Sequence, residues 1–163
     1  MNFKSFLESE EKNNVEKLLQ RLPKSHRRLL DGYKFTYTPN NTLNGDKDHI
    51  GYIHKDKIVV AAPWNYSRSF TTLHEIAHLV WEYLMDKKAR SEWSALIKST
   101  KQKQIDKFEK EAQKDALRQG DEEVFCMSYA ATYSNHPPII WINKDWQDFI
   151  SKKIPNEIKK KPK

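Results

Sequence analysis

The pattern of apolar and polar positions divides the chain into a helical start, a small sheet and a longer helical part. Apolar residues at helical spacing predict a first helix over 10–22, which Pro23 ends, and a short second helix that stops at Gly32. Three further segments alternate between apolar and polar residues or are apolar over the length of a strand. We predict these strands at 33–38, 49–54 and 58–62, the last two joined as a hairpin.

From Pro63 onward the pattern is helical. Four helical stretches are predicted there: from about residue 70 to Lys88, over 91–118 with one break near Ser99, from an N-cap at Asp121 to Tyr133, and over 144–153. This order predicts an α+β fold, in which a short mixed sheet with a hairpin edge packs on one helix and the C-terminal lobe is mostly helical. Residues 1–155 are expected to form this single domain, and 156–163 a basic, disordered tail.

The composition removes several classes of function. The chain has one Cys, so neither an intramolecular disulfide nor a zinc cluster made of cysteines is possible. Its four Gly do not gather into a P-loop or a Rossmann fingerprint. The formal net charge is +7, but residues 152–163 hold six Lys against one Glu and leave 23 basic and 21 acidic residues elsewhere. The excess therefore belongs to a solvated tail, and we do not expect a nucleic-acid partner.

The N-terminus carries no apolar segment of the kind found in signal peptides. No apolar run approaches the roughly 18 residues of a membrane span. We therefore expect a cytoplasmic protein without a membrane span, although a secreted protein whose leader had been removed would give the same pattern.

Residues 74–78 read His-Glu-Ile-Ala-His, which is the H-E-x-x-H motif. In a helix, positions i and i+4 share one face, so His74 and His78 can bind one Zn²⁺ through their imidazoles. Glu75 points near the metal without binding it and can take the proton of a zinc-bound water, which becomes the nucleophile. The alternative is a pair of surface histidines on an amphipathic helix. The apolar stripe of segment 70–85 and the strand before it favour the metal site.

A catalytic zinc needs a third protein ligand. Leu84 stands where H-E-x-x-H-x-x-G-x-x-H would place a histidine, so we expect a carboxylate from a later helix. Glu123 is preferred to Glu122, because small apolar residues follow it at one-turn spacing and would let its helix pack closely on the motif. Both carboxylates could instead complement the dipole at the helix start. Cys126, one turn further on, is predicted to be a small core residue rather than a ligand.

The motif, followed 45 residues after His78 by Glu123-x-Phe125-x-x-x-Tyr129, resembles the gluzincin type of zinc peptidase. Within that type, the chain looks most like the family of the anthrax lethal factor catalytic domain and the Pro-Pro endopeptidases. The resemblance covers most of the chain, although only the H-E-x-x-H motif is highly specific. The other matching segments are Leu22-Pro23-Lys24 with Leu29-Leu30, the hairpin from Gly51-Tyr52 to Ile58–Val60, Thr72–Glu75, and the closing aromatic helix at 146–150.

The resemblance implies a zinc-dependent endopeptidase with a zincin-like fold. One Zn²⁺ would be bound by His74, His78 and Glu123, and Glu75 would act as base and then as acid. The partner is expected to be an extended polypeptide substrate that pairs with a sheet edge by β-augmentation. We predict that this edge is the strand of Ile58, Val59, Val60, Ala61 and Ala62.

In one position the chain departs from the family. The family usually has a tyrosine seven residues before its glutamate ligand, where it donates a hydrogen bond to the oxyanion, but Ala116 stands there in this chain. Another donor is therefore needed if the activity is retained. Four side chains are candidates by their chemistry: Tyr129, Tyr133, Tyr66 and His136.

Two other functions stay open at this point. A regulatory metalloprotease of a mobile element, which acts on a repressor, shares the motif followed by a glutamate helix. A zinc-stabilised relative without catalysis would fit the missing tyrosine, but it would not need Glu75, since metal binding alone does not use that residue.

Overall fold

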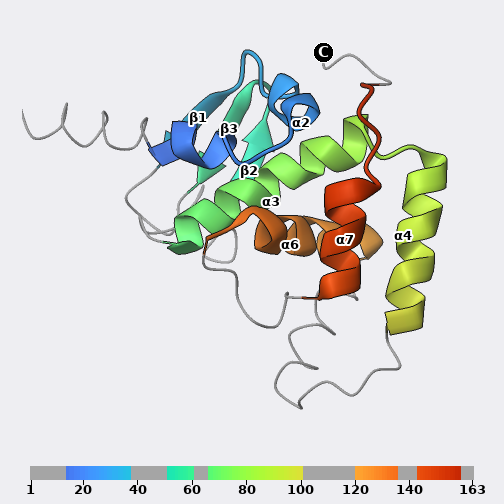
Figure 1. Ribbon diagram of the computed structural model, residues 1–163. Helices are drawn as coiled ribbons and strands as arrows, with labels where there is room; N and C mark the ends of the chain where they lie inside the picture. The colour runs from blue at the N-terminus through green and yellow to red at the C-terminus, as the bar shows by residue number, and fades with distance from the viewer. Residues whose placement is uncertain (1–13, 38–50, 61–65, 101–119, 136–142, 159–163) are drawn as a thin grey trace, which may run out of the picture.

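A computed structural model describes residues 14–37, 51–60, 66–100, 120–135 and 143–158 (Figure 1). These parts of the chain form an α+β fold, as predicted, with a helical segment at 14–19 before the labelled elements. The labelled elements are α2 (Lys24–Arg28), β1 (Lys34–Tyr37), β2 (Gly51–His54), β3 (Lys57–Val60), α3 (Tyr66–Tyr83), α4 (Lys87–Thr100), α6 (Asp121–Tyr133) and α7 (Lys144–Lys152). None of the helices in the described ranges combines the length and the apolar character that crossing a membrane requires.

The sheet is mixed, and its strand order is β1-β3-β2. β3 pairs in parallel with β1 and antiparallel with β2, so Ile58, Val59 and Val60 have hydrogen-bonded neighbours on both sides. The prediction that this strand forms the substrate edge is therefore wrong for these three residues, while Ala61 and Ala62 lie outside the described residues. The apolar run marks a central, buried strand instead, because side chains there are covered by neighbours.

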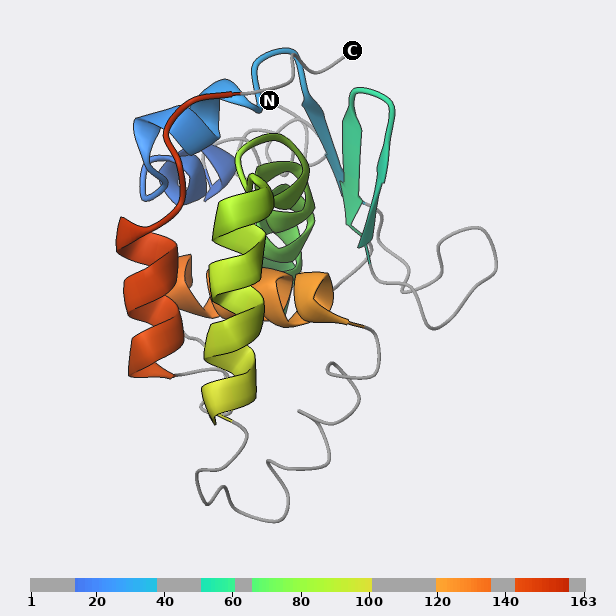
Figure 2. The ribbon, with the colours of Figure 1, turned by 90° about the vertical axis from the view of Figure 1, so that its right-hand side faces the viewer.

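Helix α3 lies between the sheet and the other large helices. Figure 2 shows the three strands on one side of α3, and α4, α6 and α7 on the other. α3 packs on β2 and β3, and its most extensive contact is with α6. The apolar stripe of the motif segment is accordingly buried, with Leu73, Ile76 and Val80 fully shielded from solvent. The helix that carries H-E-x-x-H is thus packed against other elements on two sides.

Several element boundaries differ from the predicted ones. The helix predicted to reach Lys88 ends at Tyr83, because Asp86 caps the next helix by accepting a hydrogen bond of 2.8 Å from the amide of Ala89. Gly120, with φ of +109°, caps α6 in place of the predicted Asp121. The stretch predicted at 91–118 is represented by α4, and residues 101–119 lie outside the described ranges.

The described fold continues beyond the predicted end of the domain. Ile154 is buried against the core, and the hydroxyl of Ser25 lies 3.2 Å from the side-chain oxygen of Asn156. The described residues thus include 156–158 of the segment predicted as a tail.

Arg90 joins α4 to the C-terminal end of α3, and removing it should destabilise the protein by about 2 kcal/mol. Its guanidinium donates hydrogen bonds to the carbonyls of Trp81, at 2.6 Å, and Met85, at 2.9 Å, and it lies over the indole of Trp81. The carbonyl of Trp81 lies in the last turn of α3, where carbonyls have no partner within the helix, and Met85 follows that helix. We expect Arg90→Ala to lower the urea midpoint clearly, and Lys88→Ala, at an exposed site on the same helix, to change it by less than about 0.5 kcal/mol. Equal midpoints for the two variants would contradict this role.

His26 should make the stability depend on pH. Its ring is buried, its Nδ1 lies 3.0 Å from the hydroxyl of Tyr129, and burial lowers the pKa of His26 from 6.5 to about 4. Protons therefore bind the unfolded chain more tightly, so stability is full above about pH 6.5 and falls by on the order of 3 kcal/mol as the pH drops to about 4. Urea unfolding at several pH values should show a smaller acid loss for His26→Gln than for wild type. His54→Gln, at an exposed histidine on β2, should keep the wild-type slope, and a wild-type slope in His26→Gln would contradict the assignment.

Candidate metal centre

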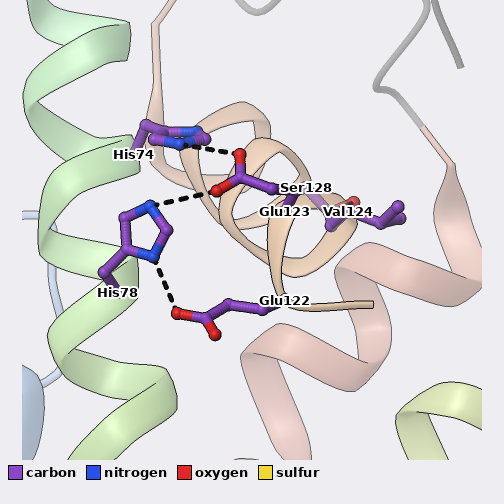
Figure 3. A network of polar contacts seen from close by, with 6 residues as sticks. All are labelled: His74, His78, Glu122, Glu123, Val124 and Ser128. Carbon is purple, nitrogen blue, oxygen red and sulfur yellow. Dashed lines mark hydrogen bonds and ion pairs between the residues drawn. The ribbon is translucent and has the colours of Figure 1, made fainter. Parts of the chain in front are cut away.

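The two histidines of the motif lie one turn apart on α3 and face α6. Their ring centroids are 5.0 Å apart and the ring planes are nearly perpendicular, at 78°. In Figure 3 both rings point from α3 toward the first turn of α6. The helical spacing that the sequence suggested thus brings His74 and His78 together.

Glu123 places its carboxylate between the two imidazoles. One oxygen lies 3.2 Å from Nε2 of His74 and the other 3.3 Å from Nε2 of His78 (Figure 3). The hydrogen bond with His74 lowers the pKa of Glu123, and its burial acts in the opposite direction. Small residues on this face of α6, namely Cys126, Ala130 and Ala131, are fully or almost fully buried and let the two helices approach closely.

Glu122 contacts the other nitrogen of His78. Its Oε1 lies 2.8 Å from Nδ1, whereas Glu123 faces Nε2 of the same ring. A hydrogen bond from Nδ1 to the carboxylate leaves the lone pair on Nε2, which is the arrangement that a metal-binding histidine needs. Glu122 and Glu123, which have the same charge and are adjacent in the sequence, thus contact different nitrogens of His78.

Glu75 follows His74 on α3 and lies against the strand β2 of the sheet. Only 7% of the residue is exposed, yet it lines the open cleft beside the histidines. A Cβ atom added to Gly51 of β2 would lie 2.8 Å from Oε1 of Glu75, so the strand backbone passes directly against the carboxylate. The position is one that only glycine can occupy without displacing a neighbour.

Cys126 lies close to the same two histidines. His74, His78 and Cys126 each offer a ligand atom within 4.8 Å of the others, so these three residues form a group that could hold a metal ion. The thiol is fully buried, as predicted for a core residue. Burial raises its pKa, and the negative charges of Glu123, Glu122 and Glu75 raise it further. Its spacing of three residues from Glu123 was the sequence signal for this proximity.

A cleft of about 950 Å³ runs along the two histidines and the glutamates around them. One wall is the strand β2, and the others are α3 and the first part of α6. The residues that line it are Gly51, Tyr52, Ile53, Phe70, Thr71, His74, Glu75, His78, Leu79, Glu82, Glu122, Glu123 and Met127.

Tyr129 and Tyr133, two of the predicted oxyanion donors, are not among the residues that line the cleft. The hydroxyl of Tyr129 is directed to His26, and the ring of Tyr133 packs on that of Tyr129 at 4.8 Å. At about 100° per residue, Tyr129 lies roughly 240° around α6 from Glu123, which puts it on another face. The side chain of Tyr66 and all of His136 lie outside the described residues.

Comparison with known proteins gives no relative. The chain matches no protein-family model, no curated protein and no solved structure. The resemblance to gluzincin peptidases therefore stays a prediction from the motifs, and any function has to be argued from the site itself.

Proposed function

We propose that the chain is a zinc-dependent endopeptidase whose metal is held by His74, His78 and Glu123. The observation that carries this proposal is the carboxylate of Glu123 placed between two Nε2 atoms. In a tetrahedral zinc site with bonds of about 2.0–2.2 Å, neighbouring N and O ligands lie about 3.3–3.5 Å apart. The separations of 3.2 Å and 3.3 Å are close to this value, each to a different oxygen of Glu123. The residues present thus fit a zinc ion.

Glu75 is the side chain best placed to move protons in the cleft. When bound, Zn²⁺ would supply a Lewis acid for the scissile carbonyl and lower the pKa of water toward 7. Glu75 would accept the proton of the attacking water and pass it to the leaving amine. Its position supports this role, because it directly follows His74, a proposed ligand, and lines the cleft. Glu122 would act as a positioning residue by fixing the tautomer of His78.

An extended polypeptide is the substrate that the cleft supports best. β2 has β3 on one side only and is an edge strand of the described sheet, and Gly51, Tyr52 and Ile53 line the cleft. A peptide that pairs with this edge would pass Glu75 and the histidines. β2 therefore replaces the central strand β3 as the proposed substrate edge. Phe70, Leu79 and Met127 would offer apolar contacts to its side chains.

The test is zinc-dependent cleavage of a peptide library. The purified protein should contain one zinc per chain by mass spectrometry under native conditions, and it should cleave a mixed peptide library monitored by mass spectrometry. A chelator should abolish cleavage, and added zinc should restore it. Glu123→Ala and His74→Ala should lose both metal and cleavage. Stoichiometric zinc without hydrolysis of any peptide would overturn the proposal and support a zinc-stabilised domain instead.

A further inference from the structure

We propose that Cys126 is a fourth protein donor to this metal, reached from the buried side of α6. The inference rests on the proposed metal site but goes beyond it, since three protein ligands suffice for catalysis. It assigns a role to the chain's one cysteine, whose thiol lies within 4.8 Å of a ring nitrogen of each histidine.

Two side chains of α6 lie close to the histidines of α3. Glu123 and Cys126 are three residues apart and therefore lie on one face of the helix, one turn from each other. The carboxylate approaches the histidines from the side of the cleft, whereas Cys126 is fully buried. With bonds of about 2.1 Å to nitrogen and 2.3 Å to sulfur, a tetrahedral site separates N from S by about 3.6 Å. The sulfur of Cys126 and the ring nitrogens lie within 4.8 Å of one another. Rotation of the cysteine side chain and a small movement of the two rings would bring them to the shorter separation of a tetrahedral site.

Sulfur is a donor that suits zinc. The negative charges of Glu123, Glu122 and Glu75 near Cys126 already compensate a divalent cation, so the thiolate would be favoured by its bond to the metal and not by charge. Binding breaks the S–H bond, forms the bond from sulfur to metal and releases the proton to water, without any change of oxidation state. Thiolate ligands also favour zinc over harder cations such as Mg²⁺ and Ca²⁺.

Ligation by Cys126 would close the site. Four protein ligands are the arrangement of structural zinc sites, and they leave no position for water. The resting protein would then hold its metal with four protein ligands. Hydrolysis would require the Cys126 thiolate to dissociate from the metal, so that water could take its place. If the proposed function holds, Cys126→Ser should bind metal more weakly, by about tenfold or more, and cleave peptides faster.

Cobalt substitution tests this directly. Co²⁺ added to the metal-free full chain should give visible d–d bands together with a near-ultraviolet charge-transfer band from thiolate to cobalt. The chain has one cysteine, so the second band can come only from Cys126. Cys126→Ser should lose the near-ultraviolet band and keep the visible ones. Ser128→Ala, at a buried position on the same helix, is the matched control and should keep both.

The possible outcomes separate the two proposals. A charge-transfer band in wild type that also disappears in His74→Ala supports Cys126 as a donor of this site. Visible bands that depend on His74, without any near-ultraviolet band, overturn the role of Cys126 and leave the proposed metal site intact. A failure to bind either Co²⁺ or Zn²⁺ overturns both proposals. The wild-type spectrum decides these cases even if the cysteine variants do not fold.

Discussion

Replacing Glu75 by Gln should lower the rate of peptide hydrolysis by about 10²–10⁴-fold while the zinc content stays unchanged. Gln has nearly the same shape as Glu but cannot accept the proton of the attacking water. The residue is almost fully buried and its neighbours are packed closely, so an isosteric change should preserve the fold. The measurement is the initial rate on a cleaved peptide, with metal analysis of the same sample.

The matched control for this change is Glu82→Gln. Glu82 is also a glutamate of α3 that lines the cleft, one turn beyond His78. Its loss removes the same charge from the same cleft without touching the proposed proton carrier, so the rate should stay within a few-fold of wild type. If both variants cleave as well as wild type, Glu75 is not the base and the proposed mechanism is wrong. If both lose activity equally, the effect is that of charge in the cleft and not of proton transfer.

The parts of the site that could be predicted are those set by local helical geometry. The pairing of His74 with His78 follows from a spacing of four residues, and it appears in the structure without any long-range information. The small residues after Glu123 correctly indicated that its face of α6 packs toward α3. The different contacts of Glu122 and Glu123 could not be predicted from the sequence. They depend on which nitrogen of His78 each carboxylate contacts across the interface between α3 and α6.

The arrangement of the strands could not be predicted, because it is a long-range property. The turn at Lys55, where φ is +52°, joins β2 to β3 and is visible as a local signal. The parallel pairing of β1 with the other side of β3 joins segments that are far apart along the chain. No local sequence pattern indicates this pairing. An apolar run was therefore assigned to the sheet edge, although burial on both faces is typical of a central strand.

The end of α3 was missed for a different reason. Nothing between Tyr83 and Lys87 is a strong helix breaker, and Leu84 and Met85 are apolar and buried. The break is stabilised by contacts that only the folded chain provides: Asp86 caps α4, and Arg90 donates hydrogen bonds to the carbonyls of Trp81, in the last turn of α3, and Met85, just after it. A capping aspartate without a preceding Gly or Pro is too weak a signal to separate two consecutive helices.

Gly51→Ala should reduce hydrolysis by about 10²-fold with a smaller effect on stability, because the added methyl group displaces the proposed base. The new Cβ would lie 2.8 Å from Oε1 of Glu75, 3.1 Å from its Cγ and 2.9 Å from Cγ2 of Thr71. The carboxylate is the flexible end of a side chain, so it can move away more easily than the strand. A displacement of about 1 Å at a catalytic group can cost about 10²-fold in rate. The loss should appear in kcat at unchanged zinc content.

A double-mutant cycle separates this steric effect from a general weakening of the strand. Alanine has a higher intrinsic preference for strands than glycine, so the substitution itself should not weaken β2. In the Glu75→Ala background, two of the three close contacts of the new methyl group are gone. The urea midpoint should therefore fall less for Gly51→Ala in that background than in wild type, with a coupling free energy of about 1 kcal/mol. Additive losses would show that the methyl group does not press on Glu75, and the activity loss would then need another cause.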